Sequence, residues 1–348
     1  MNMVRLDKKR FGEFIRELSV EYSVYGPGKV DGKTEYIPLE SDDGIDLTDH
    51  LTDMSPKGIF FPHSEILFEY DEDGIKSPQI AQKPLAVWGM RNCDSRSLLM
   101  LDRVFGSAVQ MPEEERFQDP YWKERYDTSL IFGLACNEPL STCFCNWFGG
   151  GPHNRNGMDV FVVDAGDFYL LEPLSAKGEA VIGKLSCFTD AGEEDTKLVS
   201  ELSSNAEAMM QPQPDLEGLG EKLVSIFDEP IWKDISAKCV NCGACTFNCP
   251  TCHCFDVQDE CKGKKGKRIR IWDSCMFPIF TMEASGHNPR ALSSERVRQR
   301  VMHKYSYYPE KYGEILCTGC GRCINVCPVN LDIKEVLKRI LLYNGQEE

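Results

Sequence analysis

The chain has 348 residues, of which 17 are cysteine, and its 55 acidic and 39 basic side chains give a formal net charge of −16. Apolar residues make up 42% of the sequence, enough to bury a sizeable core, which excludes a chain that is disordered throughout. The sequence has no run of 18 apolar residues and no secretory signal, so we expect a cytoplasmic protein of two domains without a transmembrane segment.

The first part of the chain alternates between predicted helices and predicted strands. Helical periodicity covers residues 11–22, 94–105 and 193–227, the last interrupted by Gln-Pro-Gln-Pro at residues 211–214. Apolar runs predict strands at residues 58–61, 66–70, 84–90 and 129–135, and residues 158–164 and 168–171 predict a hairpin. We therefore predict a mixed α/β domain over residues 1–210.

Composition changes sharply toward the C-terminus. Residues 239–348 contain 12 of the 17 cysteines and carry a net charge of +4, whereas residues 1–238 carry a net charge of −20. The acidic part would repel a phosphate backbone, so nucleic-acid binding is not expected. The change in composition leads us to predict a second domain over residues 211–348.

The cysteines themselves require an explanation. A disulfide framework is a poor one, because cytosolic thiols are kept reduced and an odd number of cysteines cannot all pair. Metal binding is the natural alternative. With only 6 histidines in the chain, sulfur-rich sites are expected in preference to mixed histidine and cysteine zinc sites.

Two segments repeat the spacing Cys-x2-Cys-x2-Cys-x3-Cys-Pro, at residues 239–250 and 317–328. This is the bacterial ferredoxin run, in which three close cysteines bind one [4Fe–4S] cube and the fourth binds the other cube. The predicted ligands are Cys239, Cys242, Cys245 and Cys327 for the first cluster, and Cys317, Cys320, Cys323 and Cys249 for the second. A pair of zinc sites is the alternative, but zinc would not require the full duplicated pattern.

The two runs are far apart, since Cys317 comes 78 positions after Cys239. Residues 293–305 and 331–342 both show helical periodicity. A compact ferredoxin would join its motifs by a short segment, so we predict a mostly helical dicluster ferredoxin domain with an insertion. The expected fold class is α+β, with this domain following the mixed α/β domain.

Four cysteines of the N-terminal domain, Cys93, Cys136, Cys143 and Cys145, lie near predicted strand ends. Neighbouring parallel strands would bring Cys93 and Cys136 together, with the Cys143–Cys145 loop close by. Four converging thiolates can hold a third iron–sulfur cluster. The alternative is four buried thiols without a metal, since cysteine is among the most buried residue types.

Five cysteines and a basic segment remain. Cys187 is expected to be a core residue, and Cys252, Cys254, Cys261 and Cys275 are interpreted either as a further metal site or as thiols that pack beside the clusters. The basic residues 262–270 predict either a solvated loop or a docking surface for an acidic partner. The arginines of the 293–305 helix, Arg296, Arg298 and Arg300, could serve the same docking role.

Seven further strings, in both parts of the chain, lie at residues 59–68, 89–94, 143–145, 249–256, 271–275, 284–290 and 296–303. They resemble the electron-transfer component of anaerobic sulfite reductase and, equally, the beta subunit of soluble sulfhydrogenases. The resemblance covers nearly the whole chain. It implies a subunit with two [4Fe–4S] clusters that passes electrons between a flavin/NAD(P)H-binding subunit and a separate catalytic subunit.

The resemblance leads us to expect an electron-transfer subunit with no catalytic residue of its own, in a hetero-oligomer of the sulfite reductase, hydrogenase or heterodisulfide-reductase type. Two alternatives stay open. One is an iron–sulfur redox sensor, although no helix-turn-helix is visible. The other is an N-terminal domain with its own reductase activity beside Cys93 and Cys143. The terminal acceptor and the direction of electron flow do not follow from the sequence.

Overall fold

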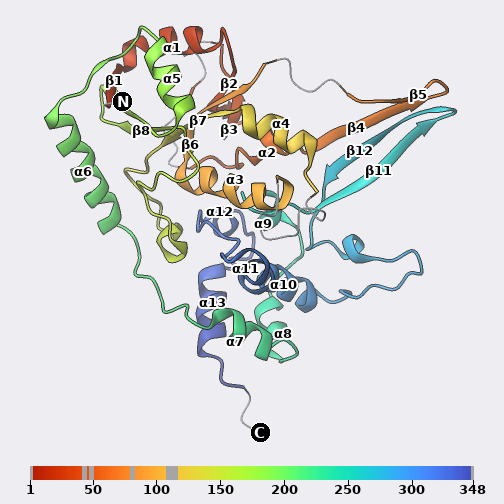
Figure 1. Ribbon diagram of the computed structural model, residues 1–348. Helices are drawn as coiled ribbons and strands as arrows, with labels where there is room; N and C mark the ends of the chain where they lie inside the picture. Colours follow the sequence, from red (N-terminus) through yellow and green to blue (C-terminus); the bar gives the residue numbers. More distant parts are fainter. Residues whose placement is uncertain (1–2, 41–44, 47–50, 79–82, 107–116, 346–348) are drawn as a thin grey trace. The chain divides into compact units, whose positions relative to one another are not determined.

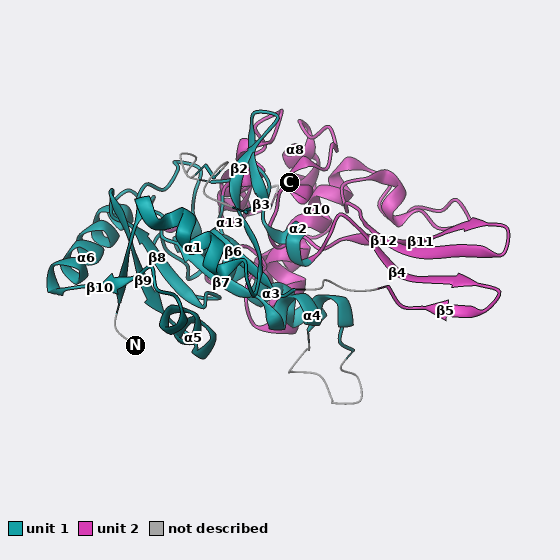
Figure 2. Cartoon of the chain, turned by 90° about the horizontal axis from the view of Figure 1, so that it is seen from above, with its two compact units in different colours: residues 1–60, 80–212, 318–320 teal, residues 61–79, 213–317, 321–348 magenta. Residues whose placement is uncertain are grey.

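The computed structural model describes residues 3–40, 45–46, 51–78, 83–106 and 117–345, which form two compact units (Figure 2). Unit 1 comprises residues 1–60, 80–212 and 318–320, and unit 2 comprises residues 61–79, 213–317 and 321–348. The sequence composition predicted a single boundary near residue 210, whereas segments of the two units alternate along the chain. Residues 61–79 belong to unit 2 because their strands pair with a hairpin of the C-terminal part.

Eight strands in the described part of unit 1 form one mixed sheet (Figure 1). In sheet order they are β10 (Thr189–Asp190), β1 (Val4–Asp7), β9 (Phe168–Pro173), β8 (Val160–Asp164), β7 (Leu130–Leu134), β6 (Leu85–Arg91), β2 (Ser23–Val30) and β3 (Lys33–Pro38). The central strands β2, β6, β7 and β8 run parallel, and the outer pairs are antiparallel. Because β6 and β7 are parallel, their carboxyl ends lie at the same edge of the sheet.

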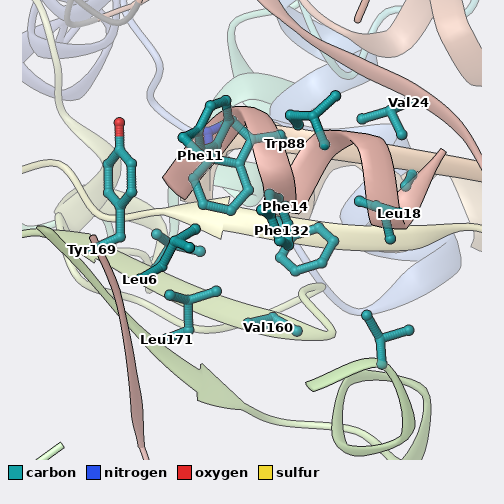
Figure 3. Close-up of a cluster of buried hydrophobic side chains, with 14 of the residues drawn as sticks. Leu6, Phe11, Phe14, Leu18, Val24, Trp88, Phe132, Val160, Tyr169 and Leu171 are labelled. Carbon is teal, nitrogen blue, oxygen red and sulfur yellow. The ribbon is translucent and has the colours of Figure 1, made fainter. Parts of the chain in front are cut away.

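Successive side chains of each strand point to opposite sides of the sheet, and both faces of the sheet are apolar. In β8, Val160 and Val162 face the main core, whereas Phe161 and Val163 face the other side, where Val199 of a helix packs. The main core is aromatic: the rings of Phe14 and Phe132 meet edge to face at 5.4 Å, close to Trp88 (Figure 3). The sheet is thus buried on both faces, as a largely parallel sheet requires.

Helices of unit 1 cover this sheet. They are α1 (Phe11–Leu18), α2 (Lys57–Phe60), α3 (Asn92–Phe105), α4 (Pro120–Thr128), α5 (Ala176–Lys184) and α6 (Glu193–Ala208), with 3-10 turns η1 (Lys8–Arg10) and η3 (Cys145–Phe148). The predicted helix at 94–105, the strand at 129–135 and the hairpin at 158–171 are confirmed, and the helix predicted at 11–22 is confirmed as far as Leu18. The predicted strand at 58–61 is wrong, since α2 occupies residues 57–60: a run of three apolar residues does not distinguish a buried helical turn from a strand.

Unit 2 contains a four-stranded sheet of order β11-β12-β4-β5 in its described residues. The strands are β4 (Ser64–Asp71), β5 (Gly74–Lys76), β11 (Phe255–Lys262) and β12 (Lys265–Trp272). The basic residues 262–270 therefore lie in a hairpin, with residues 262–265 exposed at its tip. Their charges are matched across strands, for example between Arg268 and Asp259 at 2.7 Å and between the buried side chains of Arg270 and Glu65.

The helices of unit 2 carry the cysteine runs and the insertion between them. They are α7 (Leu219–Ser225), α8 (Ile231–Ser236), α9 (Ala244–Phe247), η4 (Pro278–Thr281), α10 (Ser293–Met302), the π-helical turn η5 (His303–Tyr307), α11 (Tyr308–Tyr312), α12 (Arg322–Asn325) and α13 (Ile333–Leu342). The helices predicted at 293–305 and 331–342 are confirmed. The α+β class is likewise confirmed, with a sheet beside the helices of unit 2. No helix among the described residues is long and apolar enough to cross a membrane.

Candidate iron–sulfur sites

The first cysteine run forms a loop that leads directly into the short helix α9. Gly243 starts this helix with a φ of +74°, and a Cβ at this position would lie 2.7 Å from the ring of Phe277. Asn241 also has a positive φ, of 55°, and its side-chain amide donates to Ser293 Oγ at 2.9 Å. Left-handed residues at these two positions let the loop curl, so the cysteines can face a common centre.

One cavity of unit 2 brings together four cysteines from the two runs: Cys239, Cys242, Cys245 and Cys327. They are the four residues assigned to the first cluster. The rest of the lining consists of small or apolar residues and one cation, namely Val240, Asn241, Gly243, Ala244, Met276, Val297, Arg300, Pro328, Val329 and Leu331. Four thiols around a mainly apolar hollow match the donor set of a [4Fe–4S] cluster, so the residues present fit this group.

The second run repeats the local geometry of the first. Gly321, with a φ of +78°, starts α12 as Gly243 starts α9, and a proline follows the last cysteine of each run. Cys323 lies near Cys249 and Cys317; burial raises its pKa to about 12, and the charges of those two cysteines add to the shift. Three of the cysteines assigned to the second cluster are thus neighbours in unit 2, and the fourth, Cys320, lies in the segment 318–320 of unit 1.

The four cysteines of the N-terminal part converge at the sheet edge where β6 and β7 end. Arg91 of β6 lies opposite Leu134 of β7, and Cys93 and Cys136 each follow two residues later in the chain. A cavity of unit 1 is lined by Cys93, Cys136, Cys143, Cys145 and Cys320, together with Leu51, Asn92, Glu138, Pro139, Leu140, Pro152 and Gly319. The parallel strands therefore bring the four thiols together, and a fifth, which the cysteine spacing assigns to the second cluster, joins them.

Gly319 holds its segment against the Cys143–Cys145 loop. The Phe144 amide donates to the Gly319 carbonyl oxygen at 2.8 Å, and the Cys143 thiol lies 3.7 Å from the Cys320 carbonyl oxygen. Gly319 has a φ of +64°, and a Cβ on it would lie 2.3 Å from the carbonyl oxygen of Phe144. The approach of these two backbones therefore requires glycine.

Burial keeps the Cys145 thiol protonated in the absence of a metal. The pKa of Cys145 is raised to about 12, chiefly by burial and further by the charges of Cys136 and Cys143. Binding of iron would displace the protons, since only thiolates are ligands. In the described part of the chain, no three His, Cys, Asp or Glu side chains converge closely enough to hold a single metal ion.

The cysteines outside these groups have identifiable neighbours. Cys187 is 1% exposed in the main core of unit 1, as expected. Cys252 lies beside Cys249, and the side chains of Cys254 and Cys275 are hydrogen-bonded to each other. Cys261 is exposed, with its sulfur 2.9 Å from the Tyr70 hydroxyl oxygen.

Two of the three arginines of α10 are buried and do not form the docking face considered from the sequence. Arg296 is buried and donates to the carbonyl oxygens of Arg290 and Ala291, both at 2.8 Å. Arg300 is also buried and lines the cavity of the first four cysteines. The expectation of surface charge was wrong for these two residues, and the buried Lys304 one turn further on was not foreseen. The sequence did contain a signal for these buried cations: Arg296, Arg300 and Lys304 repeat at helical spacing ahead of the second cysteine run.

Replacing Cys187 with alanine tests the division of the cysteines. Because Cys187 packs among apolar side chains, the variant should retain all bound iron and lose about 1 kcal/mol of stability. Iron analysis and denaturant unfolding measure the two effects. Loss of iron in this variant would contradict the assignment of Cys187 to the core.

Comparisons with known proteins agree with this geometry. Residues 238–331 match the family model described as a 4Fe-4S dicluster domain, so the C-terminal part is an iron–sulfur domain. The chain is 30% identical over 342 residues to the sulfhydrogenase 2 subunit beta of Pyrococcus furiosus, covering 98% of each chain. No solved structure gives a significant match. The chain therefore belongs to the family of sulfhydrogenase beta subunits.

Proposed function

We propose that this protein is the electron-transfer subunit of a hydrogenase-type complex and relays single electrons between a flavin/NAD(P)H-binding subunit and a catalytic subunit. The observation that carries the proposal is the convergence of Cys327 with Cys239, Cys242 and Cys245 on one cavity, which is the crossover of ligands typical of a dicluster ferredoxin. The relationship to a sulfhydrogenase beta subunit supports the complex type.

The ligands proposed for the first cluster are Cys239, Cys242, Cys245 and Cys327, and those for the second are Cys249, Cys317, Cys320 and Cys323. For a third cluster we propose Cys93, Cys136, Cys143 and Cys145, supported by the cavity that all four line. Cys320 lies on that same cavity.

The role proposed for the protein's own residues is to bind the clusters and to set their surroundings. Thiolates fix the clusters, the left-handed glycines give their loops the required curvature, and the mainly apolar lining of the cavity influences the potential. When bound, clusters of this kind exchange one electron at a time. No nucleophile or general base of this chain takes part in the proposed function.

The experiment is anaerobic purification followed by iron and acid-labile sulfide analysis. Two [4Fe–4S] clusters give about 8 of each per chain and three give about 12. A preparation with zinc and no iron would contradict the proposal. A content of about 8 iron atoms and about 8 sulfides per chain would support a relay of two clusters and contradict the third cluster.

A second measurement separates a relay from an enzyme. The isolated iron-loaded chain should accept electrons from an artificial donor, yet reduce neither protons nor sulfur compounds. The complex recovered by native purification should do so. Turnover of such a substrate by the isolated chain would favour an N-terminal domain with its own reductase activity.

A further inference from the structure

A lysine lies within the sulfur-rich interior of unit 2. Lys304 is 3% exposed, and its ammonium donates three hydrogen bonds: to Cys249 Sγ at 3.3 Å, to Thr251 Oγ1 at 2.8 Å and to the Leu316 carbonyl oxygen at 3.1 Å. All three donors of the ammonium are therefore used. A buried charge is costly unless it is paired, and here the available anion is the sulfur of a proposed cluster ligand.

The backbone that places this lysine is unusual. Residues His303–Tyr307 form a π-helical turn between α10 and α11. This geometry is rare in proteins, and where it occurs it often lies at a functional site. The turn aims two consecutive residues at the proposed ligands of the second cluster: Lys304 at Cys249, and Tyr305 at Cys317. Arg300 lies one helical turn before Lys304, so both cations project from the same side.

The two cations have different sets of neighbours. Arg300 interacts with Cys245 of the first proposed cluster and with Cys323 and Cys249 of the second. Lys304 interacts with Cys249, Cys252 and Cys317. Lys304 Nζ faces three acceptors and donates a hydrogen bond to each, which is the bonding pattern of an ammonium.

A fixed positive charge stabilises the more negative of two redox states. Reduction adds one electron to a cluster, and hydrogen bonds to the ligand sulfurs and nearby charge are known determinants of cluster potential. In a water-excluded interior, such a charge is screened far less than at the surface. Lys304 therefore favours reduction of whichever cluster Cys249 binds.

We propose that Lys304 raises the reduction potential of the cluster bound by Cys249 and leaves the other cluster nearly unchanged, whereas Arg300 raises both. The inference rests on the proposed function, because it presupposes that Cys249 is a ligand. It makes the two C-terminal clusters unequal, with the Cys249 cluster a better electron acceptor than it would be without the lysine.

The test is a redox titration of the iron-loaded full chain, monitored by electron paramagnetic resonance. The variants are Lys304→Met, Lys304→Gln, Lys304→Arg and Arg300→Met. The matched control is Lys338→Met, which removes an exposed lysine of α13 whose partner is Glu335 at 2.8 Å. The signal that disappears in Cys249→Ala identifies the cluster concerned. Iron and sulfide content are measured on each preparation.

Lys304→Met should weaken reduction of the Cys249 cluster at least about tenfold, which is about 59 mV for one electron. Lys304→Arg should keep most of the original potential because it keeps the charge, and Lys338→Met should match the wild type. Arg300→Met should lower both potentials. If Lys304→Met does not load iron, the comparison of Lys304→Gln with Lys304→Arg, both of which keep N–H donors, isolates the charge.

Two failures are distinguishable. A wild-type chain that binds no iron overturns the proposed function. A fully loaded Lys304→Met or Lys304→Gln variant whose reduction changes less than twofold overturns the role of Lys304 and leaves the relay intact. A shift of equal size in both clusters also contradicts the proposal, because Lys304 contacts the ligand of one cluster only.

Discussion

Replacing Cys327 with alanine should remove the same cluster as replacing Cys239, although the two residues belong to different runs. The reason is the single cavity that both residues line. Each single variant should lose about 4 of the iron atoms, and the double variant Cys239→Ala/Cys327→Ala should lose no more than about 4. Iron analysis and paramagnetic resonance on anaerobic protein measure this.

The combination of Cys249→Ala with Cys327→Ala gives the opposite expectation. These two residues are the fourth cysteines of their runs and are assigned to different clusters, so about 8 iron atoms should be lost. Cys261→Ala is the control, because this cysteine is exposed and contacts Tyr70. If Cys239→Ala/Cys327→Ala instead loses about 8 iron atoms, each run holds its own cluster and the crossover is wrong.

Replacing Gly319 with alanine should abolish binding of the proposed N-terminal cluster. The added Cβ would meet the Phe144 carbonyl oxygen at 2.3 Å and the Cys145 nitrogen at 2.6 Å, so two backbones must separate. The Phe144-to-Gly319 hydrogen bond would then be lost, and the Cys143–Cys145 loop would move away from Cys93 and Cys136. We expect about 4 fewer iron atoms per chain and a loss of stability above the 1–3 kcal/mol or so typical of backbone strain alone.

Gly313 provides the matched control for this variant. Its φ of +76° is similar to that of Gly319, but a Cβ there would have no neighbour within 4 Å. Gly313→Ala should therefore carry the strain of a left-handed alanine, about 1–2 kcal/mol, with normal iron content. Denaturant unfolding and iron analysis of the two variants are compared. Equal iron content in both would show that the contact at Gly319 does not support a cluster.

The local pattern of the sequence predicted much of the fold. The helices at 11–18 and 94–105 and the strand at 129–135 follow from the spacing of apolar residues, which depends only on neighbours along the chain. The strand predicted at 58–61 was wrong because so short an apolar run fits the periodicity of a helix as well as that of a strand. The pairing of the basic segment at 262–270 with β4 does not follow from the sequence pattern, because the two strands are distant along the chain.

By itself, the sequence determined the chemistry: the duplicated cysteine spacing specifies an iron–sulfur domain, because a cube needs ligands at short, regular intervals. Only the tertiary structure decided what surrounds those ligands. Parallel pairing of β6 and β7 gathers Cys93, Cys136 and the Cys143–Cys145 loop, and a π-helical turn carries Lys304 to Cys249. Such contacts join residues that are distant in sequence, so their distances and burial arise only when the chain is packed.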